Sequence, residues 1–180
     1  SASAHKIGGS KGIGILYARD GVKIEPLIFG GGQARGLRGG TENVPAIAGF
    51  AKAVELAGKV NKKKIEKIRD ELIKKLEGIG GVINGPRDNE SRLYNNIHVS
   101  FPGTDAGTLV AFLSQRGIYI STGSACESRR KKEDYALKAI ALDNESIRGS
   151  LRITINENTT ASDISRVLHE IISALCVIKN

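Results

Sequence analysis

The sequence is short of several residue types, and each shortage excludes a class of protein. Its 180 residues contain only two cysteines, Cys126 and Cys176, which are too few for a disulfide scaffold and suit a reducing compartment. No apolar run reaches the roughly 20 residues of a membrane span, and no signal-peptide pattern opens the chain. We therefore expect a cytoplasmic protein with no membrane partner.

Methionine is absent altogether, and the first residue is Ser1. Because translation normally starts at methionine, we interpret the chain as a piece of a longer protein whose N-terminal part is not included. A strand-and-loop pattern begins at once at the start of the sequence, with no element before it, which fits the same interpretation.

Aromatic residues are scarce at 4%, although the net charge is +8. A basic chain can bind nucleic acid, but this one offers few rings on which bases could stack. Its lysines also alternate with Glu and Asp on helix-like stretches. We expect a solvated basic face that suits an acidic partner or an anionic cofactor, and no nucleic-acid partner.

Hydrophobic periodicity predicts the secondary structure. We expect a hairpin of strands 11–18 and 22–29 turning at Asp20-Gly21, and a helix over 44–56. Further helices are expected over 61–77, 105–115 and 135–142, with a last one capped by Thr160 or Ser162 and ending near Ile178. Short strands are expected over 82–83, 95–101, 118–120 and 150–155. This order predicts an α/β or α+β fold with helices packed on a mixed sheet.

The residues Ser3-Ala4-His5-Lys6-Ile7-Gly8-Gly9 form the first candidate site. A lysine needs an activating environment to act as a nucleophile or to form a Schiff base, since its free amine is protonated at neutral pH. Here hydrogen-bonding side chains precede Lys6, and glycines that allow close backbone approach follow it. A surface lysine in a glycine-rich turn is the alternative.

Glycines are also dense over residues 30–43, which include Arg35, Arg38 and Thr41. Arginines and a threonine in a glycine loop can clamp an anion. The alternative is a flexible linker.

Cys126 and Arg152 are two further candidate site residues. Cys126 lies among loop-forming residues and just before Arg129, Arg130, Lys131 and Lys132, and nearby positive charge favours the reactive thiolate. Arg152 lies on an alternating strand, where it points opposite to Leu151 and Ile153. We expect His98 to be a satisfied strand residue and Cys176 to pack on the apolar side of the last helix.

Several of these motifs together resemble the cysteine desulfurases of the NifS/IscS type, which depend on pyridoxal phosphate (PLP) and belong to the class-V aminotransferases. The matching segments are Ser-x-His-Lys with the following Lys-Gly-x-Gly-x-Leu-Tyr, the glycine-rich segment 30–43, and Ser-Thr-Gly-Ser-Ala-Cys at 121–126. Ser150-x-Arg152 with Thr159-Thr160 matches a fourth. The resemblance covers nearly the whole chain but only the C-terminal portion of a fold-type I PLP enzyme.

The resemblance implies a role for each candidate residue. Lys6 would hold PLP covalently, with Ser3 and His5 as phosphate ligands and Thr41 reaching the phosphate of a second subunit in a homodimer. Arg152 would bind the carboxylate of L-cysteine, which a planar guanidinium suits, and Cys126 would take its sulfur as a persulfide, leaving alanine. Arg148 is a nearby rival for the carboxylate, and an ordinary strand arginine is the alternative for Arg152. The persulfide would then pass to a sulfur acceptor such as an iron–sulfur scaffold protein, and no metal site is implied.

The resemblance also divides the chain. Residues 1–58 would be a remnant of the large PLP-binding domain, and residues 59–180 the small domain that carries the cysteine loop. Because the family's remaining PLP ligands come from its N-terminal half, we expect this piece alone to be inactive. Two alternatives stay open, namely a related PLP lyase or aminotransferase-like enzyme and a non-catalytic sulfur-carrier or interaction module.

Overall fold

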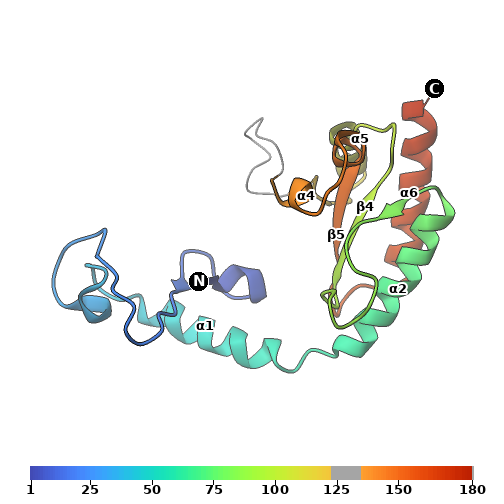
Figure 1. The fold of residues 1–180 in the computed structure, drawn as a ribbon. Helices are drawn as coiled ribbons and strands as arrows, with labels where there is room; N and C mark the ends of the chain where they lie inside the picture. Colours follow the sequence, from blue (N-terminus) through green and yellow to red (C-terminus); the bar gives the residue numbers. More distant parts are fainter. Residues whose placement is uncertain (123–134, 180) are drawn as a thin grey trace. The chain divides into compact units, whose positions relative to one another are not determined.

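The computed structural model describes residues 1–122 and 135–179 (Figure 1). The chain separates into an N-terminal unit, Ser1–Val60, and a C-terminal unit, Asn61–Asn180.

The N-terminal unit contains little regular structure. Its elements are β1 (Ala2–Ser3), the 3-10 helix η1 (Ala4–Ile7), β2 (Gly14–Ile15), a second 3-10 helix η2 (Gln33–Gly36) and α1 (Val44–Ala57). Asn43 caps α1 by accepting a hydrogen bond from the Ala46 amide at 3.2 Å, and Pro45 lies in the first turn, where its missing N–H costs nothing. Helix α1 packs against η1.

The predicted hairpin of 11–18 and 22–29 is wrong. The chain does turn at Asp20-Gly21, where Gly21 has φ 85° and Val22 donates to the Arg19 carbonyl at 3.1 Å. However, β2 pairs antiparallel with β1 instead, Ala2 facing Ile15. A two-stranded hairpin is marginal unless a face packs on something, and here Tyr17, Leu27 and Phe29 remain 80–93% exposed.

In the C-terminal unit, helices cover one face of a small sheet. Its elements are α2 (Lys62–Gly78), β3 (Val82–Ile83), β4 (Asn96–Ser100), α3 (Ala106–Ser114), α4 (Tyr135–Ala139), α5 (Asn144–Arg148), β5 (Ser150–Thr154) and α6 (Ala161–Lys179). The sheet order is β3-β4-β5. In Figure 1, α2 and α6 lie on one side of the strands and α4 on the other. Every pairing among the described strands is antiparallel, so the sheet is not mixed as predicted.

The apolar residues of the strands and helices form the core of this unit. Ile97, Val99, Leu151 and Ile153 alternate along β4 and β5 and are at most 4% exposed, with the fully buried Leu72, Leu76 and Ile171 from α2 and α6. Burying each such side chain contributes about 1.5–3 kcal/mol. Because successive strand residues point to opposite faces, the residues between them point away from the helices.

Helix ends agree with the sequence where a local cap sets them. The Asn61 side chain accepts from the Lys64 amide at 3.1 Å at the start of α2. At α6, the Thr160 hydroxyl accepts from the Asp163 amide at 3.2 Å, while the Asp163 carboxylate accepts from the Thr160 amide at 2.9 Å. This reciprocal pair is a capping box, and it selects Thr160 over Ser162.

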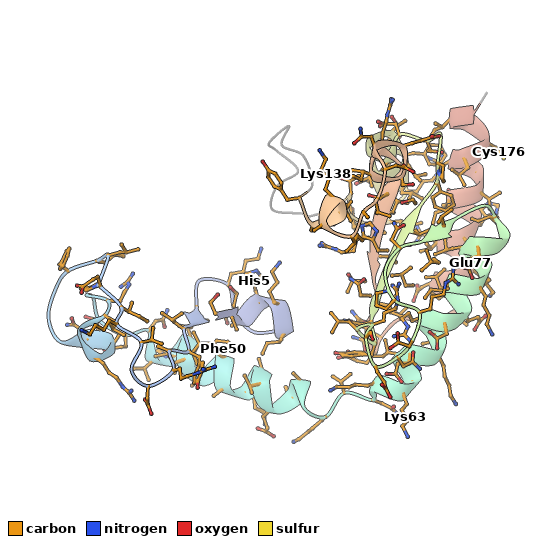
Figure 2. All side chains as sticks on the ribbon, viewed as in Figure 1. His5, Phe50, Lys63, Glu77, Lys138 and Cys176 are labelled. Atoms are coloured by element: carbon orange, nitrogen blue, oxygen red, sulfur yellow. The ribbon has the colours of Figure 1, made fainter. Side chains whose placement is uncertain are left out.

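Three other predictions for this unit are wrong. Residues 118–120 form no strand; only Ser121, the next residue, makes a β-bridge. The helix predicted over 135–142 ends at Ala139, and a separate helix, α5, follows with Asp143 as its cap. Cys176 is exposed on α6 and is not a packing residue (Figure 2).

Two buried arginines donate hydrogen bonds to backbone carbonyls of the segment between β3 and β4. Arg69 is fully buried and donates to the Leu93 carbonyl at 3.0 Å and to the Asp70 carboxylate at 2.7 Å. Arg92 is 8% exposed and donates to the carbonyls of Pro86 and Asn84. Burial, and then repulsion from Arg69, lower the pKa of Arg92. Satisfied donors make such buried charges tolerable, so these arginines hold the segment in place.

Candidate functional site

Lys6 lies on a tight turn that is anchored by one buried alanine. Ala4 is fully buried, its amide donates to the Ile13 carbonyl at 3.1 Å, and its carbonyl accepts from the Gly9 amide at 2.9 Å. Gly8 adopts φ 84°, which favours glycine, and a Cβ on Gly9 would lie 2.9 Å from the Ala4 Cβ. The glycines that follow Lys6 are therefore required by the turn itself.

The turn presents three polar side chains together. Ser3, His5 and Lys6 are exposed, while Ala4 between them is buried; Figure 2 labels His5 on η1. A hydroxyl, an imidazole and an amine on one turn suit a ligand that carries both a phosphate and an aldehyde, because the first two can donate hydrogen bonds to the phosphate and the amine can condense with the aldehyde. The donor set thus fits PLP.

The glycine-rich segment 30–43 folds back on itself through close backbone contacts, which a flexible linker would lack. Gly39 donates to the Ile28 carbonyl at 2.9 Å, and a Cβ on Gly39 would lie 2.8 Å from the Gly30 Cα. Ala34 and Arg35 take left-handed conformations, φ 48° and 59°, and the Ala34 amide donates to the Glu42 carboxylate at 3.3 Å. Thr41 is exposed beside this turn. None of the hydrogen bonds among the described residues joins Thr41 to Lys6.

Arg152 lies on the face of the sheet that the large helices leave uncovered. It is half-buried on β5, between the core residues Leu151 and Ile153. Within the described part of the chain, no residue accepts a hydrogen bond from its guanidinium. Among the described residues, nothing therefore competes with a carboxylate for these donors.

The rival Arg148 is engaged elsewhere. Its Nε lies 3.4 Å from the Asp105 carboxylate, and its side chain is 74% exposed. Hydrogen bonds from Thr108 hold the pKa of Asp105 below its usual range, and Arg148 adds to this effect. Arg148 therefore supports the start of α3, and Arg152 is the better candidate for binding a ligand.

The backbone of Arg152 is bonded to the segment that leads to Cys126. Arg152 donates to the Ser121 carbonyl at 2.7 Å, and Ser121 donates to the Arg152 carbonyl at 3.2 Å. Cys126 itself lies outside the described residues. It is nevertheless five residues beyond Ser121, and a chain of that length spans at most about 18 Å.

Sequence reasoning missed a chain of polar groups beside Arg152. The Asn84 Nδ2 atom lies 2.9 Å from His98 Nδ1 and donates to Ser100 Oγ at 2.8 Å; Ser100 Oγ donates in turn to the Ser146 carbonyl at 2.8 Å. The alternation of polar residues at 96, 98 and 100 was the only available signal, since Asn84 and Ser146 come from other elements.

A cavity of about 340 Å³ in the C-terminal unit is lined by neither Arg152 nor the polar chain. Ile118, Ile153, Ile164 and Arg166 are among its lining residues. Within residues 1–122 and 135–179, no cluster of three His, Cys, Asp or Glu side chains is placed to hold a metal ion. No helix in these ranges combines the length and apolar content that a membrane crossing requires.

Comparison with known proteins identifies the family. The model of the aminotransferase class-V family matches residues 1–167. The chain belongs to this family. The match spans both units.

The relatives of this class-V chain include cysteine desulfurases. Over 173 residues the chain is 44% identical to cysteine desulfurase IscS of Clostridium botulinum, covering 93% of this chain and 44% of that protein. Among solved structures it is similar to a NifS-like protein, with a TM-score of 0.84, 40% identity, and coverage of 97% of this chain and 45% of the other. It is also similar to SspA in complex with cysteine, with a TM-score of 0.58, 32% identity, and coverage of 88% and 44%.

These comparisons confirm the predicted family and the α/β fold class: the chain matches part of a NifS-like protein. The chain spans less than half the length of the curated relatives it matches.

Proposed function

We propose that this chain carries the cofactor lysine, the substrate-binding arginine and the sulfur-accepting cysteine of a cytoplasmic, homodimeric cysteine desulfurase. The substrate is L-cysteine and the cofactor is PLP. The observation that carries the proposal is the pair of backbone hydrogen bonds between Arg152 and Ser121. They support the proposal because they attach the strand that carries Arg152 to the segment that leads to Cys126.

Lys6, Ser3 and His5 would hold the cofactor, with Thr41 contributing to the phosphate site of the partner subunit. When bound, PLP supplies an electron sink for the substrate carbon. The turn anchored by Ala4 fixes the backbone that carries Lys6, and the Lys6 amine would move the α-proton of the substrate. Residues 1–58 would then be the remnant of the large domain and residues 59–180 the small domain.

Arg152 orients the substrate through two parallel hydrogen bonds to its carboxylate. The Cys126 thiolate attacks the substrate sulfur, so that an S–S bond forms while the C–S bond breaks and its electron pair stays with the substrate carbon. Protonation of that carbon gives alanine, and Cys126 is left as a persulfide. An acceptor thiol, such as that of an iron–sulfur scaffold protein, then takes the outer sulfur.

The test uses matched pairs of variants in the complete desulfurase that contains this chain. Lys6→Ala should abolish covalent PLP absorbance and cysteine-dependent alanine formation, because no other amine occupies the turn. Lys11→Ala, which removes an exposed lysine from the same loop, should leave both unchanged. Cys126→Ser should abolish sulfur release, whereas Cys176→Ser should not.

The alternatives make different predictions in the same assays. A related lyase would keep its activity on cysteine in Cys126→Ser. A sulfur-carrier module would be loaded with persulfide at Cys126 by another enzyme without PLP, and Lys6→Ala would then have no effect.

A further inference from the structure

We propose that His98 is a positioning residue for Arg152, and that Asn84 holds the His98 ring with its proton on Nε2. The functional meaning of this inference rests on the proposed role of Arg152.

His98 and Arg152 are directly opposite each other in the antiparallel pair β4–β5. Residues in such a pair project from the same face of the sheet with their Cβ atoms about 4.5–5.5 Å apart. Both side chains are half-buried, and their strand neighbours Ile97, Val99, Leu151 and Ile153 point into the core on the other face. The imidazole and the guanidinium are therefore neighbours on the candidate-site face.

The polar chain determines which His98 nitrogen carries the proton. Ser100 Oγ donates its hydrogen to the Ser146 carbonyl, 2.8 Å away, so toward Asn84 it can only accept. The Asn84 group that faces Ser100 must then be the donating NH₂, and this same nitrogen lies 2.9 Å from His98 Nδ1. Because two donors cannot face each other, Nδ1 accepts and the ring proton lies on Nε2.

This arrangement has a consequence for Arg152. The only lone pair of the neutral imidazole ring is used by Asn84, so the guanidinium cannot donate to a ring nitrogen. The remaining favourable contact is the flat face of the guanidinium against the flat imidazole ring. Such a contact restricts the Arg152 side chain and leaves its N–H groups for the two oxygens of a carboxylate.

The first experiment measures the ring nitrogens of His98 in the ¹⁵N-labelled 180-residue chain. The chain has three histidines, so the signals can be assigned with His5→Ala and His169→Ala. We expect His98 Nδ1 in the unprotonated range and Nε2 in the protonated range. In Asn84→Asp, a near-isosteric change, the carboxylate accepts only, and Nδ1 should become protonated. A proton on Nδ1 in the unaltered chain, or no change in Asn84→Asp, would overturn the inference.

The second experiment measures the order parameter of the Arg152 Nε–H group. We expect a value near the rigid range in the unaltered chain and a fall below about 0.6 in His98→Ala, with little change in His98→Phe, whose flat ring can still stack. His169→Ala, at an exposed position on α6, is the control and should have no effect.

An unchanged Arg152 order parameter in His98→Ala would refute the positioning role. If His98→Ala does not fold, a flexible Arg152 guanidinium in the unaltered chain would refute it equally. Neither experiment requires activity, so its outcome is independent of whether the chain serves a desulfurase.

Discussion

At the scale of single residues, contacts distinguish side chains of the same type. Arg152 and Arg148 are close in sequence, but Arg148 reaches the Asp105 carboxylate at 3.4 Å, whereas the guanidinium of Arg152 has no acceptor among the described residues. Similarly, Lys6 lies on a turn fixed by Ala4, whose carbonyl is hydrogen-bonded to Gly9 and whose amide is hydrogen-bonded to Ile13. Residue type is therefore a weaker guide to function here than the contacts of the neighbouring backbone.

Arg152→Lys should raise the KM for L-cysteine by roughly 10–100-fold. A lysine keeps the charge but loses the two-pronged geometry, and a hydrogen bond between charged groups contributes about 1.5–3 kcal/mol. Initial rates of alanine formation over a range of cysteine concentrations provide the measurement in the complete enzyme. Arg148→Lys is the control. If that variant raised KM and Arg152→Lys did not, the assignment of the carboxylate site would be wrong.

At the scale of elements, the junction between α5 and β5 determines where Arg152 lies. Gly149 separates the two elements, and its carbonyl accepts from the Phe101 amide at 2.9 Å. A Cβ on Gly149 would overlap the Phe101 carbonyl oxygen and lie 2.9 Å from the carbonyl carbon. The φ of Gly149 is −90°, so the requirement for glycine is one of space and not of backbone conformation.

Gly149→Ala should therefore destabilise the chain by about 1–3 kcal/mol, the usual cost of overpacking. Urea unfolding followed by circular dichroism gives the free energy of unfolding. Gly78→Ala is the matched control, because nothing lies within 4 Å of a Cβ there and alanine is a good helix residue. That control should be at least as stable as the unaltered chain. Equal free energies of unfolding for Gly149→Ala and Gly78→Ala would contradict this prediction, because they would show that the junction can accommodate a Cβ.

At the scale of the whole molecule, the two units differ in how much apolar surface they bury. Among the described residues of Ser1–Val60, the buried apolar side chains are Ala4, Phe50 and Ala53, whereas the remaining core residues all belong to the C-terminal unit. A domain of about 60 residues is marginal even with a good core. The N-terminal unit has no comparable core of its own.

A polypeptide of residues 61–180 should thus unfold cooperatively, with the same urea midpoint as the 180-residue chain. Residues 1–60 alone should give no cooperative transition, because their exposed Tyr17, Leu27 and Phe29 contribute nothing to stability. Urea unfolding of each polypeptide followed by circular dichroism gives the midpoint, and the slope of the curve shows whether the transition is cooperative. A cooperative transition from residues 1–60 would contradict this account.

Local signals in the sequence were sufficient to predict several features of this protein. The start of α2 near residue 61 and a cap for α6 at Thr160 or Ser162 could be predicted, because a cap bonds to an amide three residues away and needs no other part of the chain. The Lys6, Cys126 and Arg152 motifs predicted the family for a related reason, since such motifs are contiguous in sequence.

Only the tertiary structure decided which distant segments meet. The sequence predicted that 11–18 would pair with 22–29, but β2 pairs with β1; it placed Cys176 in the core, but the side chain is exposed. Nothing near His98 in the sequence predicts that it faces Arg152 or contacts Asn84. Strand pairing and burial depend on competition between segments far apart along the chain, which no local pattern contains.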